Sequence, residues 1–195
     1  MNILEFIDTI VTNLMNDIGV FAPILAGLLI IIESMLPILP LALFITINFY
    51  YMGSLVGFLV SWILTIVGCY LSYRLCRNKL KSHFDNMLDK KEHKKLHRLM
   101  RRIDKLSLEQ LTILIAIPFT PAFMVNIAAG LSNMDTKKYL VSIIIGKIFL
   151  VYFWGFIGTS LIESISNPKV LIEIGIMVLV AFILSKIVNK KYRIE

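Results

Sequence analysis

Two charged residues stand inside apolar stretches of the sequence and are the first candidates for chemistry. Glu33 is the only charged residue between Asp17 and Arg74, and Lys147 follows Lys138 by nine residues within a second apolar stretch. A charge placed in hydrocarbon is costly, so an intramembrane carboxylate or ammonium marks a functional site by default. Glu33 could exchange a proton or hold a polar headgroup, or it could hydrogen-bond to freed backbone. Lys147 could attract an anion, either a lipid phosphate or Glu33, or it could extend its stem to reach the headgroups.

Two proline pairs interrupt apolar stretches in the same way. The first is Pro37-x-x-Pro40 and the second is Pro118-x-x-Pro121. Proline removes an amide donor and disfavours helix in the residue before it, so each pair frees backbone carbonyls. An unsatisfied group in lipid costs several kcal/mol, so such backbone survives only against protein or a wet cavity. We therefore predict that both pairs border a polar site.

The order of residues after each proline pair indicates an internal duplication. An asparagine, a glycine and a span with another glycine follow each pair: Asn48, Gly53 and Gly68 in the first half, and Asn126, Gly130 and Gly146 in the second. The asparagines can both donate and accept, so they could satisfy broken backbone or contact a headgroup. The shared order predicts two halves of similar structure.

The composition identifies an integral membrane protein. Of the 195 residues, 57% are hydrophobic and only 17% are charged, which is far from the balance of a soluble domain. A span needs roughly 20 apolar residues, so the chain has room for one all-α membrane domain, residues 1–195. We predict about four spans, from the apolar segments 20–36, 54–75, 139–162 and 170–188.

The distribution of basic residues predicts the orientation. The net charge is +7, yet the first Lys or Arg is Arg74, and the residues from Arg74 to Lys105 hold twelve Lys or Arg against four Asp or Glu. By the positive-inside rule, the basic segment 76–108 and the C-terminal end face the cytoplasm of a cell membrane. The segment 109–130 must then begin and end on the same face, as a re-entrant hairpin. By analogy, 37–53 enters from the opposite face, giving an inverted repeat.

Other segments carry weaker signals. Residues 1–18 have the apolar spacing of an interfacial helix, with packing over the end of the bundle as an alternative. The basic segment has the pattern of helices on an anionic leaflet. A nucleic-acid partner is disfavoured, because topology already explains basic charge beside membrane spans. His93 and His97 have helical spacing for a metal, but no third ligand is evident. No nucleophile set, phosphate-binding glycine loop or cysteine cluster is evident, so we expect neither an enzyme nor a cofactor.

Three features of the chain together resemble the DedA/VTT superfamily, also called SNARE-associated Golgi protein-like. They are an acidic residue ahead of Pro-x-x-Pro, a basic segment, and the second-half sequence "IPFTPAFMVNIAAGLSNMDTKKYLVSIIIGKIFLVYFWGFIG". The second half is most similar to the yeast-Tvp-type branch. The resemblance covers roughly residues 27 to 160 and implies two opposed re-entrant hairpins and the transport of lipids between leaflets. The chain departs from the pattern of the superfamily at two places, so the resemblance does not predict whether transport is coupled to protons. Leu114, Ile115 and Ala116 stand where many relatives carry Arg, and Pro40-Leu-Ala replaces a common Pro-Gly-Glu.

These features together predict a scramblase or transporter of phospholipid or polyprenyl-phosphate lipid, with or without a proton. The expected partners are membrane lipids with anionic headgroups. A proton- or cation-coupled small-solute transporter of the same architecture is one alternative. A membrane-organising factor that transports nothing is another, and the sequence leaves the lipid and the oligomeric state open.

Overall fold

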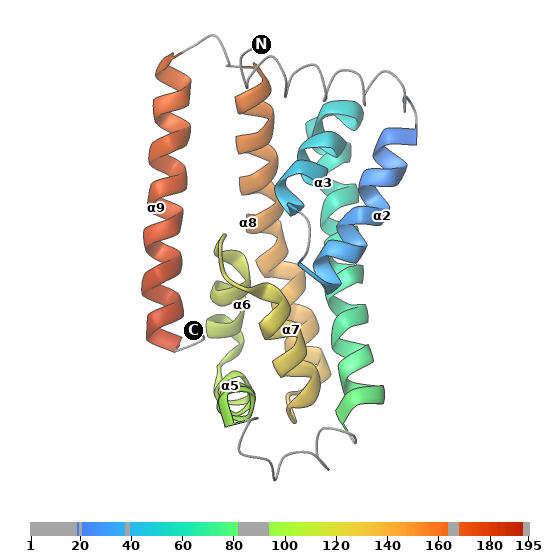
Figure 1. Cartoon of the computed structure of the whole chain (residues 1–195), viewed down its shortest axis with the longest axis vertical. Helices are drawn as coiled ribbons and strands as arrows, with labels where there is room; N and C mark the ends of the chain where they lie inside the picture. The colour runs from blue at the N-terminus through green and yellow to red at the C-terminus, as the bar shows by residue number, and fades with distance from the viewer. Residues whose placement is uncertain (1–18, 20, 38–39, 82–93, 164–167, 193–195) are drawn as a thin grey trace.

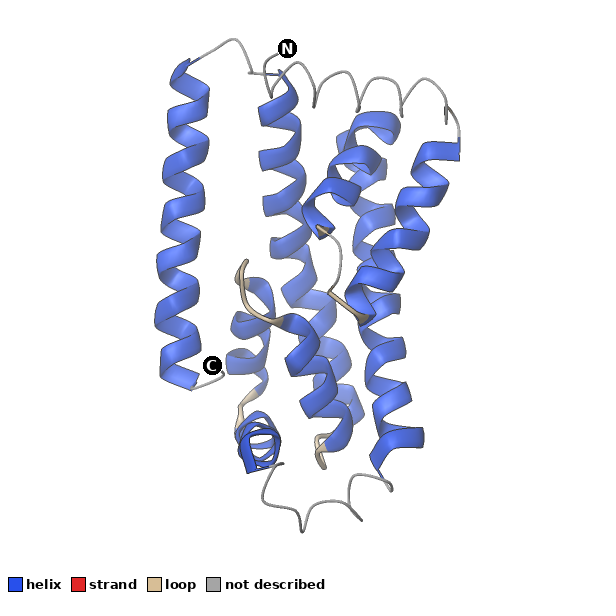
Figure 2. Cartoon of the chain, in the orientation of Figure 1, coloured by secondary structure: helices blue, strands red, loops and turns tan. Residues whose placement is uncertain are grey.

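The computed structural model describes residues 19, 21–37, 40–81, 94–163 and 168–192, and all regular structure within these ranges is helical (Figure 2). The helices are α2 (Phe21–Met35), α3 (Leu41–Leu75), the π-helix η1 (Cys76–Leu80), α5 (Lys94–Lys105), α6 (Leu108–Ala116), α7 (Ala122–Leu131), α8 (Thr136–Glu163) and α9 (Pro168–Tyr192). The predicted interfacial helix 1–18 and His93 lie outside the described residues. The all-α class is confirmed.

The first proline pair lies at the turn of a helical hairpin. Helix α2 ends just before Pro37, and the first part of α3 begins just after Pro40 and runs back alongside α2 (Figure 1). The two arms share an apolar cluster that includes Ile30 of α2 and Ile45 of α3, both fully buried. We predicted a hairpin over 37–53, and the structure corrects its bounds. The two arms are 21–35 and 41–52, because the prolines lie in the turn and the predicted apolar segment 20–36 is the first arm.

Gly53 reverses the direction of α3. Its φ of 76° and ψ of 165° lie outside the helical region, in a conformation that only glycine adopts readily. Asn48 and Ser61 flank this kink thirteen residues apart, yet the amide of Asn48 donates to Ser61 Oγ at 3.0 Å. In a straight helix, thirteen residues would span roughly 20 Å. The segment after Gly53 therefore runs back along the arm 41–52 and on to the opposite end of the molecule (Figure 1).

The second proline pair forms a matching turn between α6 and α7. A capping box starts α6: the Ser107 hydroxyl accepts from the Gln110 amide at 3.3 Å, and the Ser107 amide donates to Gln110 Oε1 at 3.0 Å. Helix α6 ends at Ala116, and the residues 117–121 reverse the chain into α7. The observed hairpin covers nearly the same residues as the predicted segment 109–130.

The two hairpins open toward opposite ends of the molecule. In Figure 1 the α2–α3 hairpin opens at the top, the α6–α7 hairpin opens at the bottom, and their turns face each other near the middle. Helix α8, the segment of α3 after Gly53, and α9 run the length of the molecule beside them.

Corresponding contacts recur in the two halves. Gly68 of α3 packs against α2, where an added Cβ would lie 2.7 Å from the Ile31 carbonyl oxygen. Gly146 of α8 packs against α6, where an added Cβ would lie 3.0 Å from the Thr112 carbonyl oxygen. In each half, the glycine lets the long helix approach the first arm of its own hairpin. Gly68 and Gly146 are the glycines that we predicted in the span after each proline pair.

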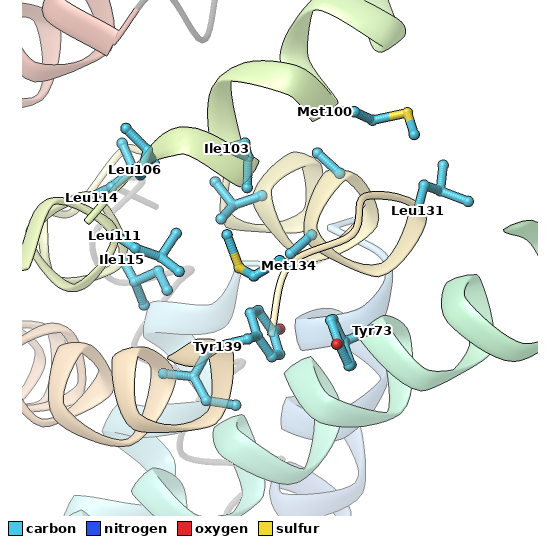
Figure 3. Packing of buried hydrophobic residues seen from close by; sticks show 14 of the residues in the cluster. Tyr73, Met100, Ile103, Leu106, Leu111, Leu114, Ile115, Leu131, Met134 and Tyr139 are labelled. Carbon is cyan, nitrogen blue, oxygen red and sulfur yellow. The ribbon is translucent and has the colours of Figure 1, made fainter. Parts of the chain in front are cut away.

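The larger apolar cluster lies between the α6–α7 hairpin and the long helices (Figure 3). Its centre is a pair of stacked rings, Tyr73 of α3 and Tyr139 of α8, whose centroids are 4.3 Å apart. Gly130 of α7 fits closely against α3, because an added Cβ would lie 2.6 Å from the Tyr73 carbonyl oxygen. The predicted glycine landmark is thus a site of close helix packing.

Helix α5 lies across the end of the bundle and is seen end-on in Figure 1. We predicted that the apolar residues of this basic segment lie on a leaflet, and the structure corrects this for α5. Leu99, Met100 and Ile103 are buried in the larger cluster, against the α6–α7 hairpin, while Arg98 and Arg101 are exposed. The apolar side of α5 is therefore occupied by protein, and its basic side faces outward.

Three described helical segments are long and apolar enough to cross a membrane: Leu41–Lys79, Thr136–Ile162 and Lys169–Tyr192. Helix α2 has 15 residues, or roughly 22 Å at 1.5 Å per residue, against a hydrocarbon core of ~30 Å. The predicted count of about four spans is therefore not confirmed. Apolar side chains such as Ile172 and Ile176 remain exposed along α9, as lipid-facing residues would be.

Candidate functional site

A cavity of about 190 Å³ lies between the two hairpin turns. Both hairpins and α8 contribute to its wall: Glu33, Ser34, Pro37, Leu41, Phe119, Thr120, Pro121, Ala122, Phe123, Lys147, Leu150 and Trp154. The hairpins come from opposite ends of the molecule and from different halves of the sequence. The site therefore exists only when both halves are folded together.

Glu33 and Lys147 are the charged residues of this wall. Glu33 lies in the last turn of α2 and is half-buried, and Lys147 is only 2% exposed on α8. The two side chains attract each other electrostatically. Gly146 sets the position of Lys147, since the missing Cβ allows α8 to pack tightly on α6 beside the cavity. The two predicted charges thus share one site.

Two hydroxyl groups of the wall are buried without a hydrogen-bond partner. Ser34 Oγ and Thr120 Oγ1 are both in this state within the described part of the chain. Buried polar groups are nearly always satisfied, so each exception calls for an explanation. Both hydroxyls lie beside a hairpin turn, Ser34 next to Glu33 and Thr120 inside the second proline pair. The cavity wall thus has more hydrogen-bonding capacity than the described protein groups use.

Aromatic rings form the apolar part of the wall. Phe119 and Trp154 make an edge-on contact with centroids 5.3 Å apart. Phe119 has a φ of 65°, in the left-handed region that bulky residues rarely adopt. Strained backbone of this kind costs of order 1–3 kcal/mol and clusters at functional sites. Here the strain turns the chain between Pro118 and Pro121 and places Phe119 against Trp154.

The start of a helix points at the cavity from each hairpin. Leu41 is the first residue of α3 and Ala122 is the first residue of α7, and both line the wall. The N-terminal end of a helix carries about half a positive charge and amides that lie outside the helical hydrogen bonds. In α7 the Ala122 amide already donates to the Thr120 carbonyl oxygen at 2.7 Å, while the Phe123 amide has no backbone acceptor among the described residues. Discontinuous helices use such ends to bind anionic groups at the midplane of transporters. The polar character of the cavity therefore comes from backbone as well as side chains.

The other predicted site residues lie outside the wall of this cavity. Pro40 and Pro118 stand at the two turns. Asn126 is 1% exposed, and its amide donates to the Ser34 carbonyl oxygen at 3.4 Å. Its carbonyl oxygen accepts from the Tyr139 hydroxyl at 2.8 Å. Asn126 therefore joins the end of α2 to α7 and α8, at the residue next to Glu33.

Asn48 makes the corresponding bond in the first half. It is fully buried and donates to Ser61, thirteen residues later, just as Asn126 accepts from Tyr139, thirteen residues later. Both bonds tie the second arm of a hairpin to the long helix that follows. Asn48 Oδ1 has no partner among the described residues. The structure thus places Asn48 and Asn126 in helix–helix contacts, and Gly130 in close packing, with none of them in the cavity wall.

Eight residues of the wall were not predicted from the sequence: Ser34, Leu41, Phe119, Thr120, Ala122, Phe123, Leu150 and Trp154. Ser34 adjoins Glu33, and Phe119 and Thr120 are the two residues enclosed by the second proline pair, so proximity to the predicted residues was a usable signal. Trp154 follows Lys147 by seven residues, which is two helical turns and the same helix face.

The apolar long helices, the opposed hairpins and the charged cavity between their turns define a helical membrane protein. Residues 33–160 match the VTT domain family, and this match begins at Glu33 and includes both hairpin turns, Lys147 and Trp154. The chain belongs to this family, the VTT domain or DedA family of membrane proteins. It is 30% identical over 157 residues to the uncharacterized membrane protein YhjE of Bacillus subtilis (strain 168). The aligned region covers 80% of this chain and 75% of that protein. No solved structure matches the chain.

Proposed function

We propose that this protein moves phospholipid or polyprenyl-phosphate lipid between the two leaflets of the cell membrane. The observation that carries the proposal is the charged cavity between two opposed hairpin turns, in a molecule whose outer surface is largely apolar. The headgroup would pass through this cavity while the hydrocarbon chains stay outside the protein. Membership of the VTT domain family supports a transporter-type role.

The lengths of the hairpin arms support a re-entrant arrangement in the membrane. Helices α6 and α7 have 9 and 10 residues, or roughly 13 and 15 Å at 1.5 Å per residue. The hydrocarbon core is ~30 Å thick, so each arm reaches about halfway. At the base of α6, a hydrogen bond from Ser107 lowers the pKa of the exposed Glu109, which favours its charged form. A charged carboxylate at this end fits a hairpin base at the membrane surface and a turn near the midplane.

The size of the cavity limits what can pass through it. In liquid water each molecule occupies ~30 Å³, so about 190 Å³ holds several waters or one small headgroup. A whole two-chain lipid does not fit. A moving lipid would therefore insert its headgroup between the hairpin turns, and its chains would lie along the exposed apolar helices.

The basic end of the molecule gives the proposed orientation. The exposed basic residues at this end are Arg74 in the last turn of α3, Lys79 in η1, Arg98 and Arg101 on α5, and Lys190 on α9. By the positive-inside rule, this end faces the cytoplasm. The α6–α7 hairpin would then enter from the cytoplasmic face, and the α2–α3 hairpin from the outer face.

Reconstitution into liposomes tests the proposal. Lipids labelled on the headgroup are placed in both leaflets, and a membrane-impermeant quencher reports how fast the inner pool becomes accessible. We expect the protein to accelerate this exchange, and Glu33→Gln and Lys147→Met to slow it. Glu173→Gln and Lys186→Met are the matched controls, because both residues are exposed on α9. Exchange no faster than in protein-free liposomes would refute lipid transport.

The two opposite charges and small volume of the cavity also suit a second candidate function, the transport of a small solute coupled to protons or cations. This candidate predicts a flux that follows an imposed pH gradient, with no exchange of labelled lipid. A membrane-organising factor would show neither activity, and Glu33→Gln combined with Lys147→Ala would still complement a deletion strain.

A further inference from the structure

Three kinds of hydrogen-bond donor line the cavity. Lys147 supplies a buried ammonium, and Thr120 supplies a hydroxyl with no partner in the described chain. In the first turn of α7 the Ala122 amide already donates to the Thr120 carbonyl oxygen at 2.7 Å, so the donor at the cavity wall is the Phe123 amide, which has no backbone acceptor among the described residues. A second unpaired hydroxyl, that of Ser34, lies on the α2 side and is 94% buried, being only 6% exposed. An ammonium, a hydroxyl and a helix start are the groups that bind phosphate oxygens in proteins.

We propose that Lys147, Thr120 and the first turn of α7 form a subsite that recognises the phosphate oxyanion of the transported molecule. This proposal rests on the proposed function in one respect, that the cavity is the path of the headgroup. It adds which groups of the cavity would bind the phosphate, and it assigns a binding role to Thr120 and to the start of α7.

Glu33 has a defined part in this subsite, as a competitor for Lys147. The carboxylate and the ammonium attract each other in the structure, and a bound phosphate would make the same attraction. Glu33 and phosphate would also repel each other, since both are anions. Phosphate entry would therefore replace the attraction of Lys147 to Glu33 with an attraction to phosphate, which limits the cost of holding the ammonium in a low-dielectric site. Phosphate release would restore the attraction to Glu33.

The aromatic wall strengthens the subsite by limiting water. Phe119 and Trp154 are in contact beside the cavity, and Phe119 keeps this place in spite of its strained backbone. Electrostatic attractions are several times stronger where water is excluded. Trp154 also provides a built-in reporter, because it lines the cavity with Lys147 and Thr120.

Equilibrium binding to the purified full-length protein tests the subsite without requiring transport. The fluorescence of Trp154 is followed during titration with inorganic phosphate, glycerol phosphate and a short-chain phosphatidylglycerol. Trp154→Phe is the control that must lose the signal, since Trp62 is the other tryptophan and lies outside the cavity wall. We expect saturable binding in the wild-type protein.

The variants predict a specific order of affinities. Lys147→Met should weaken binding at least about tenfold, and Thr120→Val about three- to tenfold, as expected for a charged and a neutral hydrogen bond. Thr159→Val is the matched control and should bind normally, because the Thr159 hydroxyl already donates to the Gly155 carbonyl oxygen at 2.9 Å. Glu33→Gln should bind phosphate more tightly than the wild type, because it removes the competing carboxylate, while its transport is slower.

The outcomes separate this inference from the proposed function. Binding that depends on Lys147 and Thr120 supports the subsite even if liposomes show no lipid exchange. Tighter binding of the short-chain lipid than of inorganic phosphate identifies a lipid headgroup as the ligand, and equal binding identifies a free phosphate. The subsite is refuted if no probe binds at millimolar concentration, or if Lys147→Met and Thr120→Val bind as the wild type does. Circular dichroism of both variants checks that the helices are intact.

Discussion

Replacing Tyr139 by phenylalanine removes the hydroxyl that connects three helices behind the cavity. This group is fully buried and lies 2.8 Å from Asn126 Oδ1 and 3.1 Å from the Cys69 carbonyl oxygen. The ring stacked on Tyr73 would remain, so the substitution isolates the hydrogen bonding. In the variant, Asn126 keeps its bond to Ser34 but loses the donor to its carbonyl oxygen.

The structure sets the size of the effect. A buried acceptor left without a donor costs about 1–3 kcal/mol, and Asn126 is 1% exposed, so water cannot replace the lost hydroxyl. The Cys69 carbonyl lies within α3 and loses only a second, longer contact. We therefore expect a loss of about 2 kcal/mol in the free energy of unfolding, or roughly thirty-fold in the unfolding equilibrium constant.

Unfolding in detergent by a chemical denaturant, followed by circular dichroism, measures this effect. Tyr152→Phe is the matched control on the same helix, because Tyr152 is 62% exposed and should change stability little. Adding Asn126→Leu to the Tyr139 variant should cost less than the two single effects together, since the two residues are bonded. If Tyr139→Phe unfolds at the same denaturant concentration as Tyr152→Phe, the proposed link between α7 and α8 is wrong.

Three further substitutions test other parts of the fold. Gly130→Val should destabilise the protein by several kcal/mol, because its Cβ would lie 2.6 Å from backbone, while Gly175→Val, which has open space, should not; a denaturation curve for each compares them. Gly53→Ala should cost about 1–3 kcal/mol, because alanine resists a φ of 76° and a ψ of 165°, and equal thermal stability in the variant would contradict the kink. Arg77→Met removes the bonds of 2.7 and 2.8 Å that its guanidinium donates to the Met134 carbonyl and the Tyr73 hydroxyl. Faster proteolysis of the loop between α7 and α8 is the expected result, and an unchanged rate would show that this arginine does not hold the loop.

The sequence by itself determined the helical membrane class, the duplicated order and the importance of both proline pairs. Long apolar stretches need every backbone group satisfied internally, so they predict helices without knowledge of any neighbour. Prolines act on their own backbone and on the preceding residue, so the turns at Pro37–Pro40 and Pro118–Pro121 are also local properties. The first hairpin was misplaced because a periodic pattern does not show whether a turn residue belongs to the helix before it or to the helix after it.

Only the tertiary structure decided which of these residues meet. Glu33 and Lys147 are 114 positions apart, and they line one cavity because Gly68 and Gly146 let each long helix pack closely on its own hairpin. The asparagines were predicted as polar candidates, but their partners, Ser61 and Tyr139, are fixed by the reversal at Gly53 and by the path of α8. Likewise, the apolar side of α5 could face lipid or protein by sequence alone. Burial against α7 settled the question, since contact between distant segments depends on how helices pack and not on the composition of either one.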